Sequence, residues 1–271
     1  MVDQRICLIG AGNMGGAIVR GWLDAGVAAE SISVVDPSPN PVIAEALTGH
    51  GVSIAASASE IGPCDLVLLA VKPQVVDAVL PSLTTLMTDD NVLLSVAAGV
   101  TIKQLAAPFG PNTRIVRAMP NTPAQVSRGV TVCCPNERVS AEQKATITTL
   151  LTTIGTVEWV GEEALMDAVT GVSGSGPAYV FHMVEAMAEA GRAAGLPDRL
   201  ANALALQTVI GAGELMHQAE EEPGQLRKNV TSPNGTTEAA LKILMAEDGL
   251  SALMTKAVQA ATDRSRELAK T

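Results

Sequence analysis

The residues that point most directly to chemistry form a glycine-rich pattern, Gly10-Ala11-Gly12-Asn13-Met14-Gly15, near the amino terminus. The pattern follows an apolar segment and opens a helical one, which is the context in which GxGxxG binds a dinucleotide. Gly10 permits a tight turn, Gly12 lets the backbone approach a pyrophosphate, and Gly15 lets helix and strand pack closely. The helix N-terminus offers N–H groups to the phosphates. The predicted cofactor contacts in this loop are Gly10, Gly12, Asn13, Met14 and Gly15.

An acidic residue, Asp36, ends the second predicted strand, about 20 residues after the glycine loop, where a carboxylate can accept from a ribose hydroxyl. A carboxylate suits a free 2′-hydroxyl and repels a 2′-phosphate. No basic residue lies between Arg20 and Lys72, and the loop after Asp36 offers only Ser38 and Asn40 as neutral donors. These residues favour NADH or dual use, and the choice between NADPH and NADH stays open.

The elements that must position these residues alternate through the first half of the chain. Continuous apolar strands separated by helices predict an α/β fold, a mostly parallel Rossmann-type sheet covered on both faces. This dinucleotide-binding domain is expected to span residues 1–161. Strands are predicted at residues 5–10, 31–36, 52–55, 65–71, 91–97, 114–119, 129–134 and 155–160, and helices at 13–25, 41–50, 73–86, 101–107 and 141–152. The last of these helices is predicted to begin with a capping box of Ser140 and Gln143.

The second half, residues 162–271, is predicted to be all-helical, a dimerisation and substrate domain. The helix at residues 177–194 is apolar around much of its circumference, so it must be buried on several sides. Burial against another subunit is favoured, and a central helix in a monomeric bundle is the alternative. Helices are predicted at residues 165–169, 177–194, 198–217, 238–247 and 250–270.

The composition excludes several function classes. Eighteen basic and 28 acidic residues give a net charge of −10, which disfavours nucleic acid as a partner. The four cysteines and three histidines lack ligand spacing, so no metal site is predicted. The longest apolar run, residues 66–71, is far too short for a membrane span, and the glycine-interrupted start is a poor signal peptide. A cytoplasmic protein without a membrane partner is expected.

Five later motifs match no generic dehydrogenase. They are Ala70-Val71-Lys72-Pro73, Ala97-Ala98-Gly99-Val100, Arg117-Ala118-Met119-Pro120-Asn121-Thr122-Pro123, Gly171-Val172-Ser173-Gly174-Ser175-Gly176-Pro177-Ala178-Tyr179 and Thr231-Ser232-Pro233-Asn234-Gly235-Thr236-Thr237-Glu238. Together, in this order and over essentially the whole chain, they resemble the pyrroline-5-carboxylate reductase family.

The resemblance implies hydride transfer from NADPH or NADH to the C=N carbon of 1-pyrroline-5-carboxylate, which gives L-proline in the last step of proline biosynthesis. It also implies a homo-oligomer built from interlocked dimers that assemble into a ring. Further cofactor contacts follow by motif position, beyond strand carboxyl ends where such ligands lie. These contacts are Ala70, Val71, Lys72, Pro73, Ala97, Ala98, Gly99, Ser57 and Asn229.

For the substrate, the resemblance points to Glu163, Ser232, Gly235, Thr236 and Thr237. Thr237 is expected to be the catalytic residue, its hydroxyl polarising the ring nitrogen. An alternative interpretation of this segment is purely structural, a turn and a helix whose cap is Thr236 or Thr237. In the same way, Ser175 is expected to cap the helix that begins near Pro177.

Two other functions remain as alternatives. A β-hydroxyacid or 6-phosphogluconate type dehydrogenase shares the two-domain plan, but it needs a lysine on the long helix, and residues 177–190 contain none. A non-catalytic, nucleotide-sensing oligomer would bind the dinucleotide without turning over a substrate.

Overall fold

The computed structural model describes residues 4–269, and within them an eight-stranded sheet has the order β3-β2-β1-β4-β5-β6-β7-β8. Strands β1 to β6 run parallel, β7 is antiparallel to β6, and β8 is parallel to β7. The strand order reverses between β1 and β4, which is where open α/β sheets bind ligands. The strands are β1 (Ile6–Ile9), β2 (Ile32–Val35), β3 (Ser53–Ala55), β4 (Leu66–Leu69), β5 (Val92–Ser95), β6 (Arg114–Met119), β7 (Gly129–Pro135) and β8 (Gly155–Trp159).

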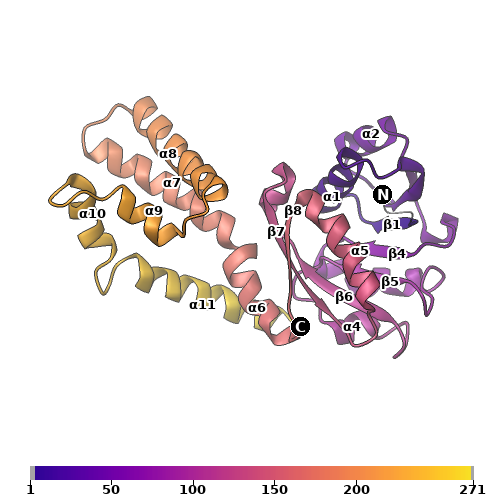
Figure 1. The fold of residues 1–271 in the computed structure, drawn as a ribbon. Coiled ribbons are helices and arrows are strands. Elements are labelled where there is room, and N and C mark those ends of the chain that lie inside the picture. The colour runs from indigo at the N-terminus through magenta and orange to yellow at the C-terminus, as the bar shows by residue number, and fades with distance from the viewer. Residues whose placement is uncertain (1–3, 270–271) are drawn as a thin grey trace. The chain divides into compact units, whose positions relative to one another are not determined.

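Both faces of the sheet are covered, as predicted for continuous apolar strands (Figure 1). Along β1, Ile6 and Leu8 join one buried cluster, while Cys7 and Ile9 join the cluster on the other face. The α-helices that accompany the sheet are α1 (Asn13–Asp24), α2 (Pro41–Gly49), α3 (Val76–Val79), α4 (Ile102–Ala106), α5 (Ala141–Leu151) and α6 (Met166–Val169).

Of two local predictions for the sheet-containing half of the chain, one is confirmed and one is wrong. Ser140 and Gln143 form the predicted capping box of α5: the Ser140 hydroxyl accepts from Gln143 N at 3.1 Å, and the Gln143 side chain accepts from Ser140 N at 3.0 Å. The single helix predicted over residues 73–86 is wrong. It divides into a 3₁₀ turn, the short α3 and a second 3₁₀ turn, Leu80–Leu83, because Pro81 lacks an N–H and cannot continue an α-helix.

The chain forms two compact units. The first comprises residues 4–174 and 261–269, and the second comprises residues 175–260. The division at residue 161 expected from the sequence stays a prediction about domain limits. The compact units run differently, because α6 and the last turns of α11 belong with the sheet. The remaining helices are α7 (Gly176–Ala193), α8 (Asp198–Gln218), α9 (Pro223–Asn229), α10 (Thr236–Leu244) and α11 (Leu250–Leu268).

Two helix starts differ from the prediction. A π-helical turn over Thr170–Gly174 leads directly into α7, and Ser175 already has helical dihedrals, so its side chain caps nothing. Helix α10 begins at Thr236 with Gly235 as its N-cap, so neither Thr236 nor Thr237 is the cap. Helix α9 was not predicted, since its seven residues are too few to show an amphipathic period.

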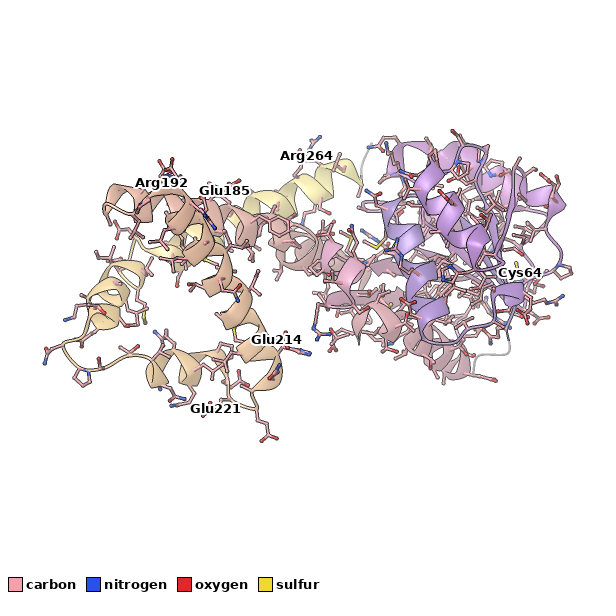
Figure 2. The ribbon with its side chains drawn as sticks, turned by 90° about the horizontal axis from the view of Figure 1, so that it is seen from above. Cys64, Glu185, Arg192, Glu214, Glu221 and Arg264 are labelled. Carbon is pink, nitrogen blue, oxygen red and sulfur yellow. The ribbon has the colours of Figure 1, made fainter. Side chains whose placement is uncertain are left out.

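The long helix α7 packs against α8, and both are amphipathic only in part. Its polar side carries Glu185 and Arg192 (Figure 2), which pair with His182 at 3.0 Å and Asp198 at 3.9 Å. The prediction that α7 is buried on several sides is not met within one chain, because Phe181 remains 64% exposed. Other large apolar side chains of α7 and α8 are exposed as well, namely Val180, Met183, Met187, Leu200, Leu204, Leu206, Ile210, Leu215 and Met216. Over residues 4–269 no helix has both the length and the apolar character needed to cross a membrane.

Candidate active site

The glycine loop joins β1 to α1, and two of its glycines are required by packing. Gly10 has φ +96°, and a Cβ there would meet Val71 Cγ1 at 2.8 Å and Ala70 O at 3.0 Å. A Cβ on Gly15 would collide with the carbonyl oxygen of Gly10. Around Gly12 there is nothing within 4 Å of such an atom. Gly12 therefore borders open space, which is the room that a pyrophosphate needs.

The backbone N–H groups at the N-terminus of α1 are not neutralised by any side chain of the helix or its cap. Gly12 is its N-cap, no side chain bonds to the cap, and no acidic residue lies in the first turn. Asn13 and Met14 are the first two helical residues, and Asn13 is exposed. Because the first N–H groups of a helix have no intrahelical acceptor, this end can bind an anion without an arginine or lysine.

Asp36 lies beside this loop, at the end of β2. One of its carboxylate oxygens accepts from Ala11 N at 2.7 Å, and the other accepts from Ser38 N at 2.9 Å. These two bonds fix the carboxylate and leave each oxygen with further acceptor capacity. Ser57 follows β3 at the same edge, where it forms a capping box with Glu60. Its backbone N–H donates to that glutamate at 2.8 Å.

The next two predicted cofactor segments follow β4 and β5, which continue the same edge. Ala70 N donates to Ile9 O at 2.8 Å, and Val96 N donates to Leu69 O at 3.0 Å, so the ends of β1, β4 and β5 are adjacent. Gly99, with φ +76°, turns the chain into α4. The structure therefore brings together, at one sheet edge, Gly10, Gly12, Asn13, Met14, Gly15, Asp36, Ser38, Ala70, Val71, Lys72, Pro73, Ala97, Ala98 and Gly99.

Glu163 belongs to the sheet-containing unit and is already bound within it. Its Oε1 atom accepts from Ile102 N at 2.8 Å and from Arg117 Nη1 at 3.1 Å. The Arg117 side chain is 5% exposed and that of Glu163 is 31% exposed. The neighbouring Cys134 thiol has a raised pKa, and burial is the main cause. The charge of Glu163 raises this pKa further, while the charge of Arg117 lowers it.

The remaining predicted substrate residues lie in the helical unit, on the turn between α9 and α10. Gly235 N donates to Ser232 O at 3.0 Å, and a Cβ on Gly235 would collide with the Ser232 hydroxyl. Asn234 has φ +58°, and its N–H donates to the Glu238 carboxylate at 2.8 Å. No side chain caps α10 at Gly235; Glu238 instead binds the turn that precedes the helix, and Thr236 and Thr237 lie in the first helical turn.

Asn229, at the end of α9, is engaged locally. Its side chain accepts from Gln225 at 2.7 Å and lies 3.4 Å from the Glu221 carboxylate. A cavity of about 370 Å³ lies between α9 and α10. It is lined by Arg227, Lys228, Thr231, Glu238, Leu241, Lys242 and Met245, and by none of the predicted substrate residues.

One functional candidate was missed by reasoning from the sequence. Arg117 was quoted only as part of a motif, although an arginine inside an apolar strand, Arg-Ile-Val-Arg-Ala-Met, is itself a signal. A charge is almost never fully buried unless it is paired. In the described residues, no group of three or more His, Cys, Asp or Glu side chains could hold a metal.

The parallel sheet, the switch between β1 and β4 and the open glycine loop define a Rossmann-type dinucleotide-dependent oxidoreductase. Residues 5–99 match the family model described as NADP oxidoreductase, coenzyme F420-dependent, and residues 163–268 match that for pyrroline-5-carboxylate reductase dimerisation. The pyrroline-5-carboxylate reductase of Pseudomonas aeruginosa is 41% identical over 100% of this chain and 98% of that protein. The chain belongs to the pyrroline-5-carboxylate reductase family.

Solved structures agree with this assignment. A pyrroline-5-carboxylate reductase from Coxiella burnetii is 37% identical, with a TM-score of 0.91 over 99% of both chains. The Plasmodium falciparum pyrroline carboxylate reductase, whose structure has NADP bound, is 29% identical, with a TM-score of 0.82 over 99% of both chains.

Proposed function

We propose that this protein reduces 1-pyrroline-5-carboxylate to L-proline with NADPH or NADH, as a cytoplasmic homo-oligomer built from interlocked dimers. The observation that carries the nucleotide half of this proposal is the glycine loop. Gly12 borders open space, and the uncapped N-terminus of α1 follows it directly. When bound, the reduced nicotinamide supplies a hydride to the C=N carbon, and a proton on the ring nitrogen completes the amine.

The cofactor is held, in this proposal, by the sheet edge described above together with Ser57 and Asn229. The loop and the start of α1 neutralise the pyrophosphate with backbone N–H groups, and Asp36 receives a ribose hydroxyl. Ala70–Pro73 and Ala97–Gly99 are assigned to the wall of the cofactor cleft. This arrangement explains how a chain of net charge −10 binds an anionic cofactor, since it relies on peptide dipoles rather than on cationic side chains.

The substrate is assigned to Glu163, Ser232, Gly235, Thr236 and Thr237. Thr237 hydrogen-bonds the ring nitrogen and polarises the imine in this proposal. A threonine hydroxyl is a poor proton reservoir at neutral pH, so solvent or the protonated substrate is the proton source. The capping arrangement supports the assignment, because Glu238 satisfies the turn and Gly235 is the N-cap, which releases both threonines from a structural task.

The oligomer is supported by the apolar side chains that one chain leaves exposed on α7 and α8. Large apolar side chains exposed in such number on two packed helices indicate an interaction site. A second copy of the helical unit would cover it, which would also satisfy the expectation that α7 is buried on several sides.

One spectrophotometric assay tests the proposed function. Oxidation of NADH and of NADPH is followed with 1-pyrroline-5-carboxylate, and reduction of both nucleotides is followed with L-proline. Turnover in the first arm is expected. Nucleotide binding without turnover would support the nucleotide-sensing alternative, and activity only toward β-hydroxyacids would support the dehydrogenase alternative.

Thr237→Ala then tests the catalytic assignment, with Thr237→Ser as its matched control. The alanine variant is expected to lower kcat by about 10²-fold, the range lost with one positioned transition-state donor. The serine variant retains the hydroxyl and is expected to retain most of the activity. Unchanged kinetics in the alanine variant would exclude Thr237 from the reaction.

A further inference from the structure

The buried guanidinium of Arg117 makes one ion pair, to Glu163, and that pair reaches a backbone atom. Glu163 Oε1 accepts simultaneously from Arg117 Nη1 at 3.1 Å and from Ile102 N at 2.8 Å. Ile102 is the first residue of α4, and the capping box of Thr101 and Gln104 serves the N–H groups of those two residues. The chain of contacts therefore runs from the middle of β6 to the first turn of α4.

This first turn immediately follows the segment that contains Ala97 and Gly99. Gly99 has φ +76° and is buried, and Val100, next along the chain, is 7% exposed. Ser95, at the end of β5, lies directly opposite Arg117 in the sheet register and accepts from Ala97 N at 3.3 Å. The segment is thus held at its strand end by Ser95 and at its helix end by the Arg117–Glu163 pair.

Stability alone is a weak reason for this arrangement. A buried ion pair repays its desolvation only partly, and replacement by apolar residues is often neutral. What the pair supplies is a fixed position, because a charge-assisted bond to Ile102 N is directional in a way that apolar packing is not.

We propose that Arg117 is a positioning residue for nucleotide binding. It holds the Glu163 carboxylate on Ile102 N and thereby fixes the Ala97–Gly99 segment against the cofactor. This inference rests on the proposed function, in which that segment forms the wall of the cofactor cleft. Arg117 acts only through Glu163, whose carboxylate binds Ile102 N.

The test uses the full-length protein and measures the dissociation constant of NADPH and of NADH by calorimetry, together with KM values and Tm. Arg117→Met is expected to weaken nucleotide binding at least about threefold, the lower range of coupling through a packed network. Arg117→Lys, which keeps the charge but loses the planar fork, is expected to recover part of that loss. Equal nucleotide affinity in the wild type and Arg117→Met would overturn the proposal.

A second pair of variants isolates the N–H group that Glu163 binds. Proline is tolerated at the first position of a helix, and Thr101 already has the extended dihedrals that precede a proline (φ −82°, ψ 157°). Ile102→Pro removes the N–H, whereas Ile102→Ala removes only side-chain atoms. Nucleotide affinity is expected to fall further in the proline variant than in the alanine variant, by at least about threefold. Equal affinities would show that the bridge does not matter for binding.

The test of Arg117 gives a result whether or not the proposed reaction is correct. Nucleotide affinity is measured without substrate, so a chain that binds nucleotide but does not reduce 1-pyrroline-5-carboxylate still tests Arg117. Conversely, a purely structural Arg117 would lower Tm in Arg117→Met and leave the nucleotide dissociation constant unchanged. Should Arg117→Met fail to fold, the Ile102 pair carries the test alone.

Discussion

The carboxylate of Asp36 accepts a hydrogen bond of 2.7 Å from the backbone N–H of Ala11, across 25 positions of sequence. This bond joins the end of β2 to the glycine loop, so the residue expected to select the nucleotide also holds the loop that is expected to bind its pyrophosphate. The second oxygen accepts from Ser38 N at 2.9 Å. A substitution at Asp36 is therefore expected to change both the choice of cofactor and the order of the glycine loop.

Asp36→Asn is expected to shift preference toward NADPH, because it removes a negative charge from the position of the 2′-phosphate. Its amide oxygen can still accept from one of the two N–H groups. Removal of one like-charge contact near the surface is worth about 1 kcal/mol or more, so the ratio of kcat/KM for NADPH over NADH should rise about fivefold or more. Glu30→Gln, which removes an exposed negative charge at the amino end of β2, is the control. A ratio that is the same in all three proteins would contradict a role for Asp36 in selection.

The two glycines of the loop are expected to behave oppositely. Gly15→Ala places a methyl group against the Gly10 carbonyl and should destabilise the fold by about 1–3 kcal/mol, as overpacking does. Gly12→Ala meets nothing within 4 Å and has an ordinary φ of −78°, so its stability should be close to that of the wild type. Its nucleotide affinity should nevertheless fall, because the methyl group would occupy the space that we assign to the pyrophosphate. Urea unfolding and nucleotide titration separate the two effects, and a Gly12→Ala protein with undiminished affinity would contradict this placement.

The exposed apolar side chains of α8 are expected to be the interface of the oligomer. Leu206 and Ile210 lie one helical turn apart and are 52% and 53% exposed. Ile210→Glu would bury an unpaired charge on association and should weaken the dimer more than about tenfold. Val42, at 76% exposed on α2, provides the matched control Val42→Glu. Light scattering across a dilution series measures both, and an unchanged mass for Ile210→Glu would place the interface elsewhere.

Alkaline pH is expected to destabilise the protein partly through Cys133. Burial, followed by the neighbouring Cys134, raises the pKa of the Cys133 thiol from 9.0 to about 12. Between those two values the unfolded chain has lost this proton while the folded chain retains it. The folded state therefore binds more protons, and stability falls as pH rises.

Cys133→Ala lacks this contribution. Its free energy of unfolding should fall less steeply above pH 9.0, by up to about 1.4 kcal/mol per pH unit. The comparison concerns the slope, since the alanine variant also loses packing at every pH. Parallel slopes in urea unfolding would mean that the Cys133 thiol ionises in the folded protein as readily as in the unfolded one.

The sequence was sufficient for those parts of the fold whose signals are local. The apolar strands, the glycine loop and the capping box of Ser140 and Gln143 each depend on neighbours within a few residues, and each is confirmed. The helix predicted over residues 73–86 is wrong for an equally local reason, because Pro81 lacks the N–H group that an α-helix needs at that position. Helix α9 was not predicted, because its seven residues are too few to show a helical repeat of apolar side chains.

The site was less predictable, because its contacts join distant parts of the chain. Nothing near Glu163 in the sequence indicates that its carboxylate bonds to Ile102 N, 61 positions away, or to Arg117. The cap of α10 was placed on a threonine because threonine is a common cap, whereas a positive φ at Asn234 lets Glu238 bond back to the turn. The roles of Thr237 and Glu163 stay predictions.

The last turns of α11 return to the sheet-containing unit, where the Ser265 hydroxyl donates to Asp167 at 2.7 Å and Thr262 is buried (Figure 1). The first unit is therefore interrupted in sequence by the whole of the second. During synthesis on the ribosome, residues 175–260 emerge before residues 261–269. The Rossmann unit therefore lacks its last segment until the helical unit has been made. The contact between Ser265 and Asp167 can therefore form only after residues 175–260 have been synthesised, and removal of the last turns of α11 would leave the nucleotide-binding unit incomplete although its own sheet is intact.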